Sequence, residues 1–144
     1  METLKIRVLP DAILRQKCKK IEKVTPEIKQ LFEVMVETMV LNHGIGLAAP
    51  QVGIDQQLIV VCIEPLIYKL ADPVIIKSQG SQVGEEGCLS VPGESVEVDR
   101  CDDIIVRGLN ENNQLVEIKA RSLLARVFQH EIDHLQGKLI VDYK

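Results

Sequence analysis

The sequence predicts an α+β fold, because strand-like patterns fill the middle of the chain and helical patterns lie towards both ends. Short turn-rich segments separate the strand-like runs, which is typical of antiparallel pairing rather than of alternating strands and helices. The 144 residues have the length of one domain, and no repeat or linker divides them. We therefore treat residues 1–144 as a single domain.

Composition and charge narrow the classes of function. Hydrophobic residues make up 46% of the chain and charged residues 26%, which is typical of a globular protein. The net charge of -4 argues against direct nucleic-acid binding, because a phosphate backbone requires a basic surface. No apolar run approaches the roughly 18 residues of a membrane span, and the N-terminus does not resemble a secretory signal. We expect a cytoplasmic protein without a membrane partner.

A long helix is the first predicted element, from Val24 to His43. Thr25 is expected to cap its N-terminus, Pro26 to occupy its first turn and Gly44 to end it. Apolar residues recur between these ends at steps of three and four, which predicts a face packed against a core. These residues are Ile28, Leu31, Phe32, Met35, Val36, Met39 and Val40.

Strands and a second helix are expected in the rest of the chain. The residues 95–99 alternate with a period of two, as in a half-exposed antiparallel strand, and the turn-rich segment 110–113 predicts a hairpin. The second helix is expected from Ser122 to Gln136, ended by Gly137. The predicted strands are residues 57–63, 74–77, 95–99, 104–107, 115–118 and 139–141.

The second predicted helix carries a candidate metal site. His130 and His134 are four residues apart, so on a helix both imidazoles lie on one face and can reach one metal ion. Glu131 adds a carboxylate that can move protons for a metal-bound water. So short a pattern also occurs by chance, and the alternative is an ordinary solvated face of the helix.

Cys88 is the candidate third ligand, because a catalytic metal usually takes three protein ligands. One thiolate and two imidazoles suit a borderline divalent metal. The alternative is that Cys88 is a nucleophile with a histidine base, which would leave the second histidine redundant. The remaining cysteines are expected to be free thiols: Cys18, Cys62 and Cys101.

Residues 44–53 form a third segment, rich in glycine and alanine. It lacks the G-K-[ST] ending of a phosphate-binding loop. It is either a tight turn after the first helix or a backbone edge that a ligand can approach closely. In the second case, Gln51 offers an amide N–H that can stabilise a developing oxyanion beside a metal.

Together, residues 44–51, 86–90 and 129–134 resemble, in this order, the three signature motifs of the peptide deformylase family. These enzymes remove the formyl group from the N-terminal methionine of newly made proteins. The resemblance covers nearly the whole chain and implies small antiparallel sheets packed around a central C-terminal helix, with a long N-terminal helix. It implies one metal ion, usually Fe2+ and replaceable by Zn2+, Ni2+ or Co2+. The implied ligands are Cys88, His130 and His134.

The resemblance also implies how the other residues act. Glu131 would be the general acid/base, taking a proton from the metal-bound water that attacks the formyl group and passing it to the leaving amine. Gln51 and the backbone N–H of Leu89 would stabilise the charge on the formyl oxygen. The peptide would lie extended, with its methionine side chain in an apolar pocket to which His130 also contributes. The expected substrate-binding residues are Ile45, Gly46, Gly87, Leu123 and Val127.

The chain departs from the family pattern away from these residues. Asp72 precedes Pro73 where asparagine is common, and Ser122 stands where glycine is common. The sequence stops at Lys144, where many bacterial members continue into a further helix. Such a compact form would suit a phage-encoded or otherwise trimmed member, acting in the cytoplasm of a bacterial cell. The expected partners are N-formylmethionyl nascent peptides and the ribosome near its exit tunnel.

Two other functions fit part of the pattern. A catalytically silent relative would bind formylated peptides without needing Glu131. A zinc endopeptidase uses the same histidine spacing, but its third ligand is a downstream glutamate or histidine rather than a cysteine. We further predict that Glu86 and Arg100 pair to hold the Cys88 loop, that Asp133 orients a neighbouring group, and that His43 caps the first helix or faces water.

Overall fold

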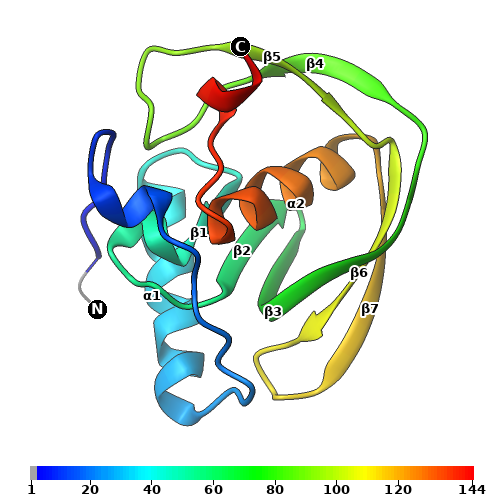
Figure 1. Cartoon of the computed structure of the whole chain (residues 1–144). Coiled ribbons are helices and arrows are strands. Elements are labelled where there is room, and N and C mark those ends of the chain that lie inside the picture. The colour runs from blue at the N-terminus through cyan, green and yellow to red at the C-terminus, as the bar shows by residue number, and fades with distance from the viewer. Residues whose placement is uncertain (1–2) are drawn as a thin grey trace.

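A five-stranded antiparallel sheet and a helix packed across it form the centre of the fold (Figure 1). The structure is a computed structural model, and it describes residues 3–144. Its α-helices are α1 (Pro26–Leu41) and α2 (Ser122–Leu135), and its short 3-10 helices are η1 (Ala12–Arg15), η2 (Ala49–Val52) and η3 (Ile140–Tyr143). Its strands are β1 (Gly46–Ala48), β2 (Leu58–Ile63), β3 (Leu66–Gln79), β4 (Gln82–Glu86), β5 (Val96–Arg100), β6 (Asp103–Leu109) and β7 (Leu115–Arg121).

The strands form two antiparallel sheets. The larger has the order β1-β2-β3-β6-β7, and within the described part of the chain β4 pairs only with β5. We call residues 82–100, which contain β4, β5 and the loop between them, the β4–β5 arm. Helix α2 contacts β1, β2, β6 and β7 on one side and β5 on the other, so it joins the arm to the sheet. The predicted hairpin around residues 110–113 is confirmed, with Leu109 opposite Leu115.

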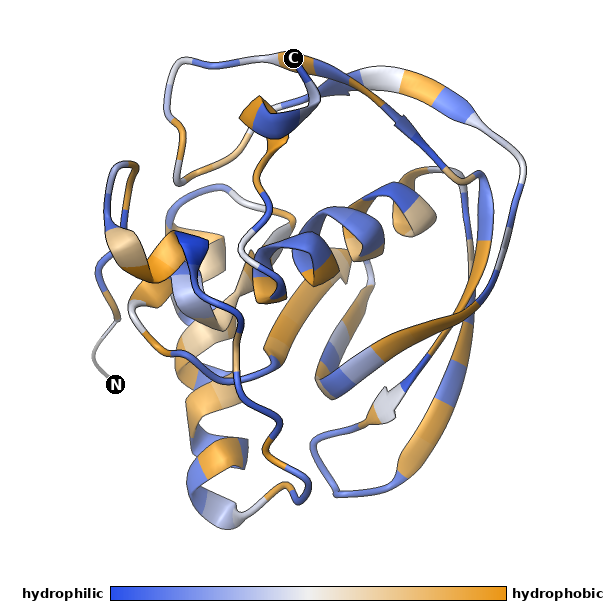
Figure 2. Ribbon diagram, viewed as in Figure 1, coloured by the Kyte–Doolittle hydropathy of each residue, from blue (hydrophilic) through white to orange (hydrophobic). Residues whose placement is uncertain are grey.

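Strand β2 is covered on both faces, which explains its uninterrupted apolar sequence (Figure 2). Leu58 and Val60 belong to the core that packs against α1. Ile59 and Val61 belong to the core that packs against α2. The two helices therefore cover opposite faces of the same strand, and α2 is held in the interior.

Helix α1 begins as predicted but ends earlier. The Thr25 hydroxyl accepts a hydrogen bond from the Ile28 N–H at 3.3 Å, which confirms the cap. The helix ends at Leu41, and the residue in the left-handed conformation is His43 (φ 59°) rather than Gly44. The backbone N–H groups of His43 and Gly44 bond to the last-turn carbonyls of α1 and offset this conformation. His43 thus caps the helix through its backbone, and its side chain is exposed.

Strand β3 is longer than the predicted segment 74–77, because it continues through Asp72 and Pro73. The pairing with β6 shifts register there, and Asp72 has a φ of 51°. The Asp72 carboxylate accepts the N–H groups of Ile21 and Glu22 at 2.9 and 2.8 Å, which attaches the N-terminal segment to the sheet. This irregularity interrupts the alternating pattern, so the sequence shows only part of the strand. β1 and β4 were also missed, since one is short and the other is polar.

The second helix is confirmed, but the strand predicted at residues 139–141 is wrong. Residues 140–143 form η3 instead, and the segment pairs with no strand among residues 3–144. The Asp142 carboxylate accepts the Leu139 N–H at 3.0 Å and pairs with Arg15 at 2.6 Å, which closes a turn. Leu139 and Ile140 are buried in a small core beneath β5. No helix in the described chain is long and apolar enough to cross a membrane.

Candidate metal centre

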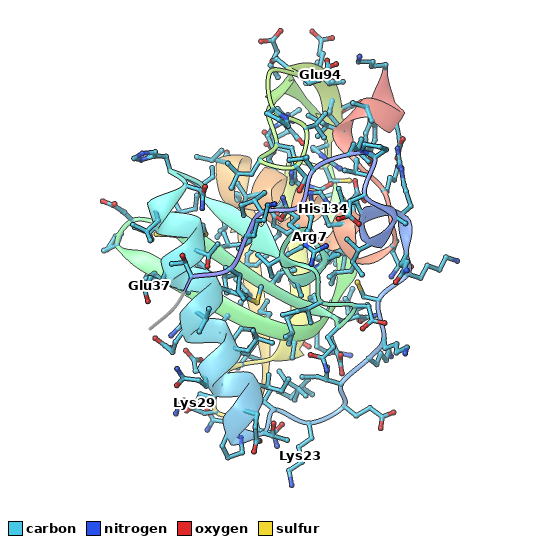
Figure 3. The ribbon with its side chains drawn as sticks, turned by 90° about the vertical axis from the view of Figure 1, so that its left-hand side faces the viewer. Arg7, Lys23, Lys29, Glu37, Glu94 and His134 are labelled. Atoms are coloured by element: carbon cyan, nitrogen blue, oxygen red, sulfur yellow. The ribbon has the colours of Figure 1, made fainter. Side chains whose placement is uncertain are left out.

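The structure brings Cys88, His130 and His134 together, although the cysteine is more than forty residues from the histidines in sequence. One ligand atom from each lies within 4.8 Å of the others, and Cys88 Sγ is 3.4 Å from His134 Nε2. Helix α2 presents both imidazoles, and the loop after β4 presents the thiol. Figure 3 shows His134 in the interior, whereas Glu94 lies at the outer end of the arm.

The environment of these groups fits a divalent cation. His134 Nδ1 and Glu131 Oε1 are buried polar atoms without a hydrogen-bond partner among residues 3–144. Burial lowers the pKa of His134 well below its usual value, so its imidazole is neutral, as a metal ligand must be. Burial also lowers the pKa of His130, but the charge of Glu131 and hydrogen bonds to Cys88 and Glu86 together raise it to about 10, so without a metal this imidazole carries a proton that a bound cation would replace. Groups that attract a proton so strongly also attract a metal cation.

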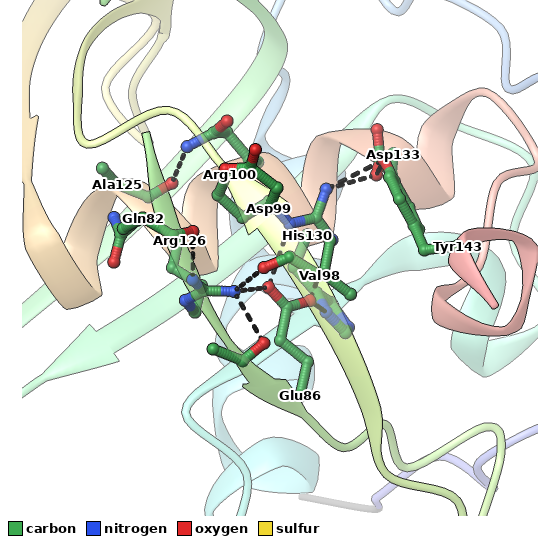
Figure 4. Close-up of polar contacts among 12 residues, drawn as sticks. Gln82, Glu86, Val98, Asp99, Arg100, Ala125, Arg126, His130, Asp133 and Tyr143 are labelled. Carbon is green, nitrogen blue, oxygen red and sulfur yellow. Dashed lines mark hydrogen bonds and ion pairs between the residues drawn. The ribbon is translucent and has the colours of Figure 1, made fainter. Parts of the chain in front are cut away.

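Glu86 fixes the orientation of His130 (Figure 4). Its Oε1 lies 2.8 Å from His130 Nδ1, which leaves His130 Nε2 as the ligand atom. Arg100 donates to both carboxylate oxygens, at 2.8 and 2.9 Å, so the predicted Glu86–Arg100 pair is present. Burial raises the pKa of Glu86, but hydrogen bonds from Arg100 and His130 outweigh burial and lower it to about 2. The carboxylate therefore stays charged and accepts the His130 N–H.

Arg100 is held in turn by Asp133 of α2 and Tyr143 of η3. Its Nη1 donates to Asp133 Oδ2 at 2.6 Å and to the Tyr143 hydroxyl at 3.1 Å. The Tyr143 hydroxyl donates to the same Asp133 oxygen at 2.6 Å. Asp133 thus orients Arg100, a neighbouring group as predicted, rather than a ligand. Tyr143 was missed because only the turn after α2 returns it to this network.

Glu131 is buried beside the cluster. Its Oε2 lies 4.0 Å from His130 Nε2, and burial raises its pKa to about 7. The backbone of β1 passes directly over it at Gly46. A Cβ atom at Gly46 would overlap the Glu131 carboxylate and lie 2.8 Å from Val127 Cγ1. Only glycine leaves room there for the carboxylate.

The Gln51 side chain is buried and fixed at both ends. Its Oε1 accepts the Ala48 N–H at 2.9 Å, and its Nε2 donates to Ser90 Oγ at 3.2 Å and to Cys88 Sγ at 3.6 Å. The Leu89 N–H, next to Cys88, donates to no acceptor within the described part of the chain. The Gln51 amide nitrogen therefore lies at the thiol side of the cluster, and the Leu89 N–H follows Cys88 directly in the sequence. Ser90, which the sequence analysis did not single out, sets the direction of the Gln51 amide.

A cavity of about 520 Å³ opens onto the cluster. Strand β1 forms one wall, and because it is the end strand of the sheet its outer edge pairs with no strand among residues 3–144. Ile45 and Leu123 are about half exposed at the cavity, and His134 lies behind its lining. The lining includes Ile45, Gly46, Gln51, Gly87, Cys88, Leu89, Leu123, Val127, His130 and Glu131, all of them predicted. The lining also includes Arg126, which the sequence did not predict.

Residues 3–144 match the family model described as polypeptide deformylase. The chain belongs to the polypeptide deformylase family. A peptide deformylase of Halothermothrix orenii is 46% identical over 99% of this chain and 94% of that protein. The solved structure of the Ehrlichia chaffeensis peptide deformylase in complex with actinonin has a TM-score of 0.96 and 38% identity, covering 100% of this chain and 90% of that one. A probable peptide deformylase of Synechococcus phage S-SSM7 has a TM-score of 0.94 and 41% identity, covering 99% and 100%.

Membership in this family makes the chain a peptide deformylase, an enzyme class whose members are metal-dependent and act on formylated nascent peptides. The cluster of Cys88, His130 and His134 supplies a group of residues able to hold the metal.

Proposed function

We propose that this deformylase removes the formyl group from the N-terminal formylmethionine of newly synthesised polypeptides and releases formate. The observation that carries the proposal is the buried Glu131 carboxylate beside the Cys88, His130 and His134 cluster, within a cavity open to a peptide. A protein that only binds peptides has no need of a buried carboxylate with a pKa raised to about 7.

Cys88, His130 and His134 would hold the metal, with Fe2+ as the native ion and Zn2+, Ni2+ or Co2+ as replacements. A divalent metal in this position lowers the pKa of water and polarises a carbonyl group. The protein contributes orientation, because Glu86 fixes the ring of His130 and helix α2 fixes the spacing of the two imidazoles.

Glu131 would transfer the proton in two steps. It accepts a proton from the attacking water as the water oxygen bonds to the formyl carbon, and it delivers a proton to the amine nitrogen as the carbon–nitrogen bond breaks. Burial raises its pKa to about 7, so both protonation states are accessible near neutral pH. The products are formate and a free amino terminus.

Gln51 Nε2 and the Leu89 N–H would stabilise the negative charge that develops on the formyl oxygen. The Gln51 amide is already oriented by Ala48 and Ser90, so little reorganisation is needed during the reaction. The loss of one such donor typically reduces the rate by about 10²–10³.

The peptide would bind as an added strand. The outer edge of β1 begins at Gly46 and is proposed to supply main-chain hydrogen bonds to the peptide, and Ile45 and Gly87 line the same cavity. The Ile45 carbonyl itself accepts the Cys62 N–H of β2 at 2.8 Å. Leu123 and Val127 on α2 would contact the methionine side chain. Because the related Ehrlichia chaffeensis enzyme forms a complex with actinonin, we expect actinonin to occupy this cavity and to block the reaction.

The test is formate release from a formylmethionyl peptide by anaerobically prepared, iron-loaded protein, with Glu131→Ala as the comparison. We expect release by the wild type and a loss of at least about 10²-fold in the variant. Metal-loaded wild type that binds the peptide but releases no formate would favour the silent binding protein. Equal rates from both proteins would exclude Glu131 from proton transfer.

A further inference from the structure

Arg126 is a buried, charged residue beside the proposed metal centre, and the proposed reaction gives it no role. It lies on α2 four residues before His130, so the two side chains leave the same face of the helix. Its side chain is only 10% exposed. An arginine is rarely buried without strong partners, and its partners here all belong to the β4–β5 arm.

The Arg126 guanidinium bonds to four positions of the arm (Figure 4). Nη1 donates to Glu86 Oε2 at 2.6 Å, to the Val98 carbonyl at 3.0 Å and to the Gly84 carbonyl at 3.4 Å, and Nη2 donates to the Gln82 carbonyl at 2.8 Å. Gly84 leaves room for it, because a Cβ atom there would lie 3.2 Å from Nη2. One side chain of α2 therefore bonds to both β4 and β5.

The contacts of Arg126 join the β4–β5 arm to α2, which the Glu86–Arg100 pair does not do. Glu86 and Arg100 both belong to the arm, so their pair cannot place the arm relative to α2. Arg126 bonds across this boundary, and the Arg100–Asp133 contact is a second link further along the helix. Cys88 follows Glu86 by two residues. Its distance from the imidazoles of α2 thus depends on how the arm sits on the helix.

We propose that Arg126 is a positioning residue that holds the β4–β5 arm on α2, so that Glu86 meets His130 and Cys88 meets His134. The inference rests on the proposed metal ligands. A lysine would be a poor replacement, because one ammonium group cannot reach the spread of acceptors that the planar guanidinium reaches. Arg126 acts on the metal centre through Glu86 and the arm rather than by contact with substrate.

The test is Co2+ binding by the metal-free full chain under anaerobic conditions. The variants are Arg126→Lys and Arg126→Met, the second of which keeps most of the apolar stem. The matched control is Arg107→Met, since Arg107 pairs with Glu117 on the exposed surface of β6 and β7, where the two side chains are 47% and 49% exposed. Chelator competition gives the dissociation constant. The thiolate-to-cobalt absorption band reports whether Cys88 is a ligand.

We expect both Arg126 variants to bind Co2+ about 10–100-fold more weakly than the wild type and to show a weakened thiolate band. The control should stay within about twofold of the wild type. Wild-type affinity and spectrum in the Arg126 variants would overturn the inference, even if their melting temperatures fell, because Arg126 would then only stabilise the fold. If Arg126→Met does not fold, Arg126→Lys decides. No thiolate band in the wild type would instead overturn the proposed ligand set, and this inference with it.

Discussion

Gly46→Ala tests whether the approach of β1 to Glu131 matters for the reaction. The new Cβ atom would lie 2.8 Å from Val127 Cγ1 and 2.9 Å from Glu131 Cδ, whereas ordinary contacts begin near 3.4 Å. The clash is relieved only if the carboxylate, Val127 or the β1 backbone moves by at least about 0.5 Å. A misplacement of about 1 Å at a reacting group can reduce the rate 10²-fold. We expect kcat/KM for formate release to fall by about 10–100-fold.

A double-mutant cycle shows whether the loss acts through Glu131. Gly46→Ala is measured alone and in a Glu131→Ala background, where the carboxylate is absent and only the close contact with Val127 remains. Activity should fall in the first case and change by less than about threefold in the second. Leu115→Ala is the control, because that side chain is 67% exposed on β7 and is not part of the cavity lining. Equal losses in both backgrounds would show that Gly46→Ala perturbs the cavity without acting on Glu131.

Three further predictions concern stability. The pKa of Glu86 is lowered from 4.5 to about 2, which corresponds to roughly 3 kcal/mol of stabilisation of the folded protein. This stabilisation is present above about pH 4.5 and is lost as the pH falls through 2. The unfolding free energy of the metal-free protein, measured with urea, should show this decline, and that of Glu86→Gln should not. Ser122 has a φ of 51°, a left-handed conformation that strains any residue with a Cβ atom. Ser122→Gly should remove this strain and raise the unfolding free energy by up to about 1 kcal/mol. A lower melting temperature in the variant would contradict this account. Tyr143→Phe removes the hydroxyl between Arg100 and Asp133 and should lower the unfolding free energy by about 1 kcal/mol. Formate release should stay within about threefold of the wild type. A larger loss of activity would give Tyr143 a direct role.

Local patterns predicted the helices well and the strands only in part. The Thr25 cap and the spacing of His130 and His134 depend on nearest neighbours along one helix, and the structure has both. The extent of β3 and the turn at residues 140–143 depend on contacts with distant segments, as Asp72 with the N-terminal segment and Asp142 with Arg15 show. Such contacts leave no periodic trace in the sequence.

Residue types and local spacing already define the chemistry available at the metal centre: two imidazoles one helical turn apart, a carboxylate beside them, and a cysteine and a glutamine in two further segments whose order resembles one family. That these segments meet, that Glu86 orients His130 and that Arg126 joins the arm to α2 follows from the packing of distant elements. The difference lies in the sequence separation of the residues involved. Helical spacing follows from the backbone geometry of consecutive residues, whereas the distance from Cys88 to the histidines follows from how a sheet, a helix and an arm pack together.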